Sequence, residues 1–163
     1  MNRLGLIAAL ALSTFSLPAL AAHPELGATD EPATNPAWYV SVQTYSFHEH
    51  TDDVELHNTT PGIGVIRRQD HWLAGLGVFR NSLGRWAGYG YGGYQVPFGP
   101  VLVGGILGVT HRYNVNNGGI VPLAAAVVSI PLGKKAMVEL VGIPGVSNYT
   151  YTTLNVSFSW RFR

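Results

Sequence analysis

The closing segment of the chain alternates strictly between polar and apolar residues, and this alternation constrains the fold more than any other feature. Residues 155–162 read Asn-Val-Ser-Phe-Ser-Trp-Arg-Phe. Side chains of a β-strand point alternately to opposite faces. One face holds Val156, Phe158, Trp160 and Phe162, and the other holds Asn155, Ser157, Ser159 and Arg161. A soluble sandwich would not turn its Val-Phe-Trp-Phe side to solvent, so we predict a strand with its aromatic face in lipid and its polar face in a lumen.

The composition supports a membrane barrel. Charged residues make up 12% of the chain, against about 25% in soluble domains. There are 20 glycines and no cysteine, so no disulfide framework or thiol chemistry is expected. No apolar run after residue 22 is long enough for a spanning helix. A chain that is apolar, glycine-rich and without such a helix is typical of an antiparallel β-barrel whose outside faces lipid.

The N-terminal region predicts export. Arg3 precedes an apolar run, Pro18 interrupts it, and residues 19–21 read Ala-Leu-Ala, so residues 1–22 are interpreted as a secretory signal peptide. Without Arg3 the mature chain has nine basic and nine acidic residues, which argues against a nucleic-acid partner. Residues 23–36 contain three prolines and are expected to form an irregular periplasmic segment. Residues 37–163 form the predicted barrel domain.

Eight strand-like runs follow, separated by turn signals. They cover 37–48, 61–68, 71–80, 85–95, 101–111, 121–131, 135–143 and 152–162. An even number of strands can close without leaving an exposed edge. The first, third, fifth and seventh connections are mostly longer than the others, as expected for loops at the cell exterior when the N-terminus is periplasmic.

This topology predicts two girdles of lipid-facing aromatic residues. The periplasmic girdle holds Trp38, Trp72, Tyr94, Trp160 and Phe162, and the outer girdle holds Tyr45, Phe47, Phe79 and Trp86.

The predicted interior is unusually apolar for a scaffold barrel. Residues 101–109 are apolar or glycine at both parities, and residues 87–93 place glycines on one face. Glycine within a strand leaves room for another group. Either these positions form a narrow slot suited to an acyl chain, or the glycines let strands bend and aromatic neighbours pack.

Candidate reactive groups gather at the outer strand ends. His48 ends the first strand, and Asn81 and Ser82 occupy the second outer connection. A serine and a histidine at one rim can form a base-activated hydroxyl. The acidic, histidine-containing loop after His48 has side chains that can bind a divalent cation, but we interpret it as a solvated loop and expect no metal site.

Several motifs resemble the lipid A palmitoyltransferase (PagP) family of Gram-negative outer membranes. The motifs are Phe79-Arg80-Asn81-Ser82, Ala87-Gly88-Tyr89-Gly90, Gly108-Val109-Thr110-His111-Arg112, Ile120-Val121-Pro122-Leu123, Ile143-Pro144-Gly145 and the closing segment 155–162. They occur in order between about residues 44 and 163. The resemblance implies a barrel whose interior contains a slot that measures acyl-chain length. It also implies an enzyme that moves a palmitoyl chain from a phospholipid to lipid A.

The resemblance also implies roles for individual residues. His48 is the best match for the family's histidine and His50 is the alternative match, while Ser82 matches the family's serine. Asn81 stands where the family has aspartate; it cannot carry charge or act as a base and can only orient by hydrogen bonding. Substrate-binding positions are implied at Gly88, Gly90, Arg112, Pro122 and Pro144. Gly90 matches the glycine that sets the slot depth, and the two prolines lack the amide donor that strand pairing needs.

The leading hypothesis is therefore an outer-membrane acyltransferase with His48 as general base, Ser82 as polar partner and Asn81 as orienting group. It needs no cofactor, uses a phospholipid donor and a lipid A acceptor, and is expected to be a monomer. The alternative is a non-enzymatic small outer-membrane barrel that binds lipid or acts as an adhesin or scaffold.

Overall fold

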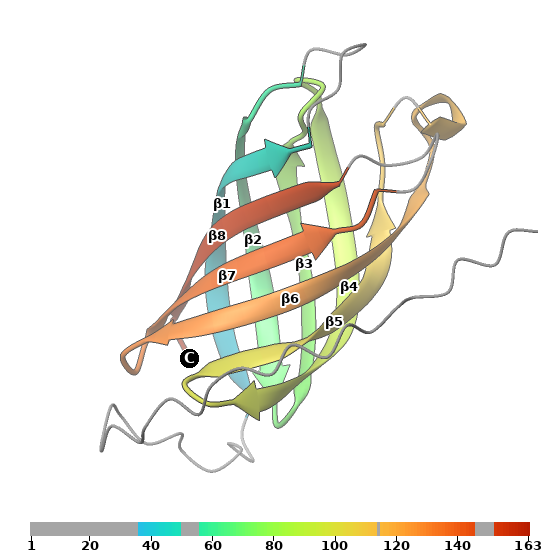
Figure 1. The fold of residues 1–163 in the computed structure, drawn as a ribbon. Coiled ribbons are helices and arrows are strands. Elements are labelled where there is room, and N and C mark those ends of the chain that lie inside the picture. The colour runs from blue at the N-terminus through green and yellow to red at the C-terminus, as the bar shows by residue number, and fades with distance from the viewer. Residues whose placement is uncertain (1–35, 50–55, 114, 146–151) are drawn as a thin grey trace, which may run out of the picture.

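The computed structural model describes residues 36–49, 56–113, 115–145 and 152–163. The predicted signal peptide and nearly all of the predicted periplasmic segment lie outside these residues. The described chain forms one closed antiparallel barrel in which each strand pairs with its sequence neighbours and β1 pairs with β8 (Figure 1). The strands are β1 (Ala37–His48), β2 (Thr59–Gln69), β3 (Trp72–Arg80), β4 (Trp86–Phe98), β5 (Val101–Thr110), β6 (Val121–Leu132), β7 (Ala136–Ile143) and β8 (Thr153–Arg161).

The predicted fold class, an all-β eight-stranded antiparallel barrel, is confirmed. Every predicted run overlaps its observed strand, and β1 has the predicted bounds. The largest difference is at β4, which continues to Phe98 through Pro97. A short 3-10 helix, η1 (Val115–Gly118), lies between β5 and β6. No helix in the described ranges is long and apolar enough to cross a membrane.

The two ends of the barrel differ in their connections. The β2–β3, β4–β5 and β6–β7 turns are short and use positive φ angles at Asp70, Gly99 and Gly133. We call this the short-turn end, and the opposite end, with the longer connections, the long-loop end. Glycine and aspartate suit such turns because they adopt the left-handed conformation at low cost.

Strand alternation separates a lumen from a lipid-type surface. On β8, Asn155, Ser157 and Ser159 are buried, whereas Phe158 and Trp160 are more than half exposed. Large apolar side chains are also exposed on the strands from β1 to β6. An outer surface of this kind is stable in hydrocarbon and not in water.

The aromatic girdles are largely as predicted, with one correction. The predicted members Trp72, Tyr94, Trp160, Phe162, Tyr45, Phe47 and Trp86 are exposed on the outer face. Trp38 is partly buried. The prediction that Phe79 belongs to the outer girdle is wrong, because its side chain is buried and faces the lumen. Its position has the inward parity of β3, which the sequence of glycines and apolar residues on that strand does not reveal.

The lumen is filled at the short-turn half by a hydrogen-bonded ionic cluster. The guanidinium of buried Arg68 donates to Gln95 Oε1 at 2.5 Å, to Ser129 Oγ at 2.9 Å and to Glu139 Oε1 at 2.7 Å. Its charge also lies 5.9 Å from the ring centre of Tyr39. The four members come from β2, β4, β6 and β7. A buried charge pair is tolerated where further hydrogen bonds accompany it, as they do here at the two terminal nitrogens of Arg68, while its Nε has no partner within the described part of the chain. The cluster occupies the barrel interior below the long-loop half.

Candidate functional site

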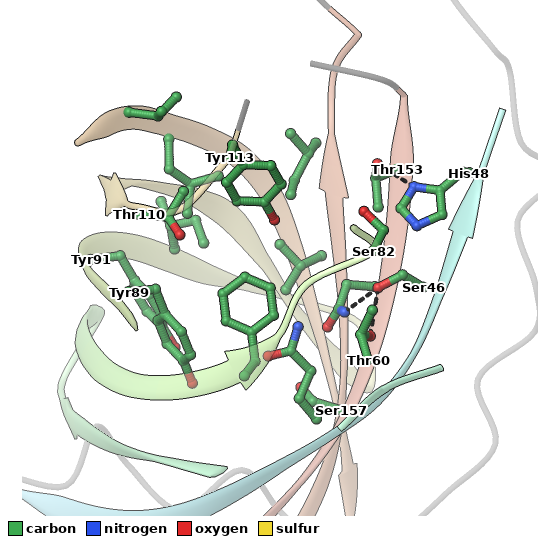
Figure 2. Close-up of a pocket in the computed structure, with 18 of the residues that line it drawn as sticks. Ser46, His48, Thr60, Ser82, Tyr89, Tyr91, Thr110, Tyr113, Thr153 and Ser157 are labelled. Atoms are coloured by element: carbon green, nitrogen blue, oxygen red, sulfur yellow. Dashed lines mark hydrogen bonds between the residues drawn. The ribbon is translucent and has the colours of Figure 1, made fainter. Parts of the chain in front are cut away.

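The long-loop half of the lumen contains a cavity of about 440 Å³ (Figure 2). All eight strands contribute to its lining, and Glu139 of the ionic cluster forms part of its foot. Leu56, Ser82, Leu83 and Tyr113 line it from the long-loop connections. Burial raises the pKa of the Tyr113 phenol to about 12, so this group is neutral at ordinary pH. The cavity itself lies in the barrel interior, where the sequence predicts a slot.

One wall of the cavity is polar over its whole depth. Across the β1–β8 ladder, the inward pairs are His48 with Thr153, Ser46 with Asn155, Gln43 with Ser157 and Ser41 with Ser159. All but Ser159 line the cavity. Ser46 Oγ lies 2.8 Å from Thr60 Oγ1, and Asn155 Nδ2 donates to Ser46 Oγ at 2.8 Å. This wall can hold polar groups, because hydroxyl and amide side chains both donate and accept.

An irregularity in β1 aims His48 inward. The β1 register shifts between Gln43 and Tyr45 on both of its neighbours. Before the shift the odd-numbered Ser41 is buried, and after it the even-numbered Ser46 is buried. Without the extra residue His48 would have outward parity and face lipid. A β-bulge commonly re-aims a side chain in this way next to a functional site.

His48 has one ring nitrogen fixed and the other unused. Its Nδ1 lies 3.0 Å from Thr153 Oγ1. Its Nε2 is buried and has no hydrogen-bond partner within the described part of the chain. If Nδ1 carries the proton and donates to Thr153, Nε2 presents a lone pair. His48, Thr153 and Ser82 all line the cavity, and Figure 2 draws Ser82 beside the His48–Thr153 pair in that view.

Asn81 is fully buried and does not line the cavity. Its Oδ1 accepts from the backbone N–H groups of Leu83 and Arg85 at 3.2 and 2.9 Å, and its Nδ2 donates to the carbonyl of Arg112 at 3.0 Å. The side chain thus shapes the turn that carries Ser82 and ties it to the connection after β5. Its hydrogen bonds are all with backbone groups, and its orienting role in acyl transfer stays a prediction.

Ser82 is held by its own backbone. Its carbonyl accepts from the His57 N–H at 2.8 Å, and the turn around it closes through Gly84 N–H donating to Asn81 O at 2.8 Å. Gly84 has a φ of 76°, a conformation that favours glycine. The turn therefore fixes the Ser82 side chain, which is itself buried, at the cavity wall.

The wall opposite the polar pairs is built from two tyrosines. Tyr89 and Tyr91 stack with ring centres 6.0 Å apart and planes 8° apart, and Figure 2 shows both on the side away from Ser46 and His48. A Cβ at Gly75 would lie 2.5 Å from the Tyr91 ring. A Cβ at Gly64 would overlap the Tyr89 hydroxyl. Glycines of β2 and β3 thus make room for these rings. Within the two segments for which aromatic packing was one of the open interpretations, a Cβ at Gly108 would lie 2.7 Å from Tyr91 Cβ.

The placement of Gly88 and Gly90 is a correction. Neither lines the cavity, because the inward parity of β4 falls on Ala87, Tyr89 and Tyr91. A Cβ at Gly90 would have only Gly75 O within 4 Å. The sequence Gly-Tyr-Gly-Tyr does not say which parity faces the lumen, and the tyrosines occupy the side that was assigned to the glycines.

The remaining predicted substrate-binding residues divide between the cavity and its surroundings. Pro122 lines the cavity, whereas Arg112 and Pro144 do not. Arg112 is exposed and has a φ of 67°. Pairing between β6 and β7 begins only at Ala126 and Gly142, so residues 121–125 of β6 have no β7 partner. This stretch is paired with β5 on its other side and borders the upper cavity, and Pro122 within it has no N–H to offer.

Two other histidines lie in the regions that the sequence singles out, His111 in one of the motifs and His50 as the alternative to His48. His111 Nε2 accepts from the Gly88 N–H at 3.0 Å, just beyond the last β4–β5 pair, so it caps the end of that ladder. His50 and most of the acidic loop around it lie outside the described residues. In the described ranges no group of histidine and acidic residues is arranged to hold a metal ion.

Sequence reasoning missed Thr153, Thr60 and Glu139 as parts of the site. Glu139 is the one acidic residue in the otherwise apolar sequence of β7, and this pattern indicates that its side chain pairs with a buried cation. No signal in the sequence pairs Thr153 with His48, because that contact depends on barrel closure between β1 and β8.

No protein-family model and no curated protein matches the chain. A solved structure with the same fold is the de novo designed TMB2.3, with a TM-score of 0.53 and 17% identity over 83% of this chain and 99% of the designed one. The Yersinia pestis outer membrane protein Ail, in a phospholipid bilayer nanodisc, gives a TM-score of 0.49 and 11% identity over 78% of this chain and 100% of Ail. The protein is an eight-stranded barrel of the outer-membrane type, and this likeness assigns no activity to it.

Proposed function

We propose that the protein is an outer-membrane acyltransferase that moves a palmitoyl-like chain from a phospholipid to lipid A. The observation that carries the proposal is the state of His48. Its Nε2 is buried without a partner among the described residues, and its Nδ1 is held by Thr153. An oriented imidazole with a free lone pair at a cavity wall is the arrangement required of a general base.

The cavity supports an acyl substrate. Away from the β1–β8 wall its lining is mainly apolar or aromatic side chains, among them Phe79, Ile106, Leu123 and Val141. Its foot is closed by Glu139 and the ionic cluster, so a chain entering from the long-loop end has a limited depth. With the long-loop end at the cell exterior, the cavity opens at the leaflet in which lipid A lies.

The reaction is a transesterification, and its atoms balance without a cofactor. A lipid A hydroxyl transfers its proton to His48 Nε2 while its oxygen attacks the ester carbonyl of the donor. Ser82 donates a hydrogen bond to the carbonyl oxygen as negative charge develops there. When the ester bond breaks, the leaving glycerol oxygen of the lysophospholipid takes the proton from Nε2. Thr153 holds the ring orientation through its contact with Nδ1, and this hydrogen bond can persist while Nε2 carries the proton.

The stretch of β6 that has no β7 partner supports a lateral route for lipid. Residues 121–125 make no ladder with β7, and Pro122 lies both in this stretch and at the cavity. Strands that are not hydrogen-bonded to each other can separate at low cost. A membrane lipid can then pass its acyl chain into the lumen without leaving the bilayer.

The test is mass spectrometry of lipid A from a host that lacks lipid A palmitate and expresses this protein. We expect one added acyl chain, and its loss in His48→Ala and Ser82→Ala. Phe47→Leu is the matched control, because Phe47 is the exposed neighbour of His48 on the lipid face. No added mass with the folded wild-type protein, or full addition by His48→Ala, would contradict the proposal.

A second candidate is a barrel that binds lipid without transferring it. It is favoured by Asn81, because an amide occupied by backbone groups provides no charge near Ser82. A lipid that co-purifies in a one-to-one ratio, together with unmodified lipid A, would support this candidate over the enzyme.

A further inference from the structure

The polar wall of the cavity is poorly matched to a plain hydrocarbon chain. Methylene groups cannot hydrogen-bond, and covering hydroxyl or amide groups with them costs free energy. Yet Ser41, Gln43, Ser46, Asn155 and Ser157 all face the cavity from β1 and β8. The apolar residues are concentrated on the other strands, so the cavity has two chemically different sides (Figure 2).

The polar groups just below the His48–Thr153 pair form a cluster whose hydrogen-bonding groups are not all used. Ser46, Thr60 and Asn155 are 4%, 1% and 7% exposed. Two hydrogen bonds, each of 2.8 Å, join Ser46 to the other two side chains. Asn155 carries a second amide hydrogen and a carbonyl oxygen that these two bonds do not use. The cluster is therefore preorganised and can still both donate to and accept from a ligand group.

We propose that the acyl chain bound in this cavity carries a hydroxyl group near its carbonyl end, and that the Ser46–Thr60–Asn155 cluster binds this hydroxyl. The proposal rests on the proposed function in one respect, since it places the carbonyl at His48 and Ser82. It names the substrate class that the cavity prefers, a 3-hydroxyacyl chain over an unsubstituted chain of equal length.

The spacing of the wall agrees with a hydroxyl on the third carbon. The Ser46–Asn155 pair lies two residues deeper than the His48–Thr153 pair on both strands. Two residues correspond to about 7 Å along a strand, or about 5 Å along the axis of a barrel whose strands tilt by roughly 40°. A 3-hydroxyl on a chain whose carbonyl is held at His48 lies within hydrogen-bonding distance of that level.

The opposite wall suits the unsubstituted remainder of the chain. Tyr89 and Tyr91 present ring surfaces, and Ile106, Leu123 and Val141 present aliphatic ones. The tyrosine rings are supported from behind by the glycine positions of β2 and β3. Of the other polar groups on these strands, Thr110 donates to Gly88 O and Glu139 pairs with Arg68. We therefore expect the discrimination between chains of equal length to come from β1, β2 and β8.

The experiment is a competition assay with the full chain folded in detergent micelles. A fluorescent fatty acid is displaced by hexadecanoic acid or by 3-hydroxyhexadecanoic acid. One additional neutral hydrogen bond corresponds to a preference of about fivefold, so we expect the hydroxylated acid to compete about five times more strongly. Ser46→Ala and Asn155→Leu should each bring the ratio close to one. Leu123→Ala, on the opposite wall, should weaken both acids and keep their ratio.

Folding of every variant is checked by the mobility of the unheated barrel on gels, so a misfolded variant is recognised and the remaining one decides. Equal competition by the two acids, binding of neither acid, or an unchanged ratio in a folded Ser46→Ala or Asn155→Leu protein would overturn the inference. A fivefold preference that these variants abolish supports it even if no transfer to lipid A is found, in which case only the proposed function fails. Faster transfer of palmitoyl than of 3-hydroxypalmitoyl chains supports the enzyme and overturns the inference.

Discussion

The β1–β8 wall and the β5–β6 wall of the lumen use the same antiparallel ladder for different purposes. The inward pairs of β1–β8 are polar on both strands. Those of β5–β6 are Thr110 with Val121, Gly108 with Leu123, Ile106 with Ala125, Gly104 with Val127 and Leu102 with Ser129. They are apolar apart from Thr110 at the rim and Ser129 in the ionic cluster. Backbone geometry is therefore not what distinguishes the walls. The difference lies in which residues occupy the inward parity, and it gives the cavity a side that can hydrogen-bond and a side that can only pack.

The side chains of the two walls are also kept ordered in different ways. On the β1–β8 side, two inward pairs near the long-loop end are joined directly across the ladder, His48 with Thr153 and Asn155 with Ser46. Buried polar groups that are satisfied in this way stay ordered without a ligand. On the other side, order comes from rings packed closely on glycine backbone. The largest effects are expected where the two sides meet, at the ionic cluster.

Removing Arg68 should have the largest effect on stability. Arg68→Met leaves Glu139 buried without its cation, and we expect the free energy of unfolding to fall by about 3–5 kcal/mol. The measurement is urea unfolding of the barrel in lipid vesicles. The double variant Arg68→Met, Glu139→Leu should recover most of the loss, since no uncompensated charge remains. A double variant as unstable as the single one would mean that the cluster links the walls mainly by packing.

Substitution of His48 should have the largest effect on activity. We expect His48→Ala to lower acyl transfer at least 100-fold, in the range of general base catalysis, with little effect on unfolding. Thr153→Val should lower transfer about tenfold, because the ring then loses the hydrogen bond that orients it. The readout is the initial rate of lipid A acylation in vesicles. Equal rates for Thr153→Val and wild type would show that the polar wall does not orient the base.

The packed wall is tested by adding one methyl group. Gly75→Ala places a Cβ 2.5 Å from the Tyr91 ring, and we expect a loss of about 2–3 kcal/mol in unfolding free energy from overpacking. Adding Tyr91→Ala to this variant should remove the overlap, so the two substitutions should be strongly non-additive. Additive losses would show that the glycine is required for the strand backbone and not for the ring.

Much of the fold could be predicted from the sequence, because lipid on one side and a lumen on the other impose a period of two. Strand number and most bounds depend on that pattern together with turn residues such as Gly99 and Gly133. Parity was predictable only where the two faces differ. It was clear on β8, where serines alternate with aromatic residues, and it failed at Phe79 and Gly90, whose strands have small or apolar residues on both faces.

The site was predictable in part for a related reason. His48 and Ser82 could be placed at one rim from topology alone, and both line the cavity. The contacts that define their chemistry could not be predicted, because they join residues about 105 positions apart through barrel closure, as between His48 and Thr153. The register shift near Tyr45, which turns His48 inward, also has no signal in the residue pattern.

Asn81 offers a smaller and sharper test of how Ser82 reaches the cavity. Asn81→Asp restores the residue type of the resembling family but removes the N–H that donates to Arg112 O. We expect it to lower the free energy of unfolding by about 1–2 kcal/mol and to reduce acyl transfer. Asn81→Ala, which removes the turn hydrogen bonds as well, is the comparison variant. Faster transfer in a folded Asn81→Asp protein would mean that charge at this position matters more than the turn.

Tyr113 should have the smallest effect, and only in alkali. Burial raises the pKa of its phenol to about 12 in the folded protein, against about 10 in an unfolded chain. The unfolded state therefore loses this proton first, so the stability that the neutral phenol supports is intact below pH 10 and declines between pH 10 and 12. Tyr113→Phe cannot ionise, and its loss of stability between pH 9 and 11 should be about 1 kcal/mol smaller than that of the wild type. Urea unfolding at the two pH values measures this difference. Parallel pH dependence in the two proteins would show that the phenol is hydrated at the cavity mouth, and that this end of the packed wall is open to water.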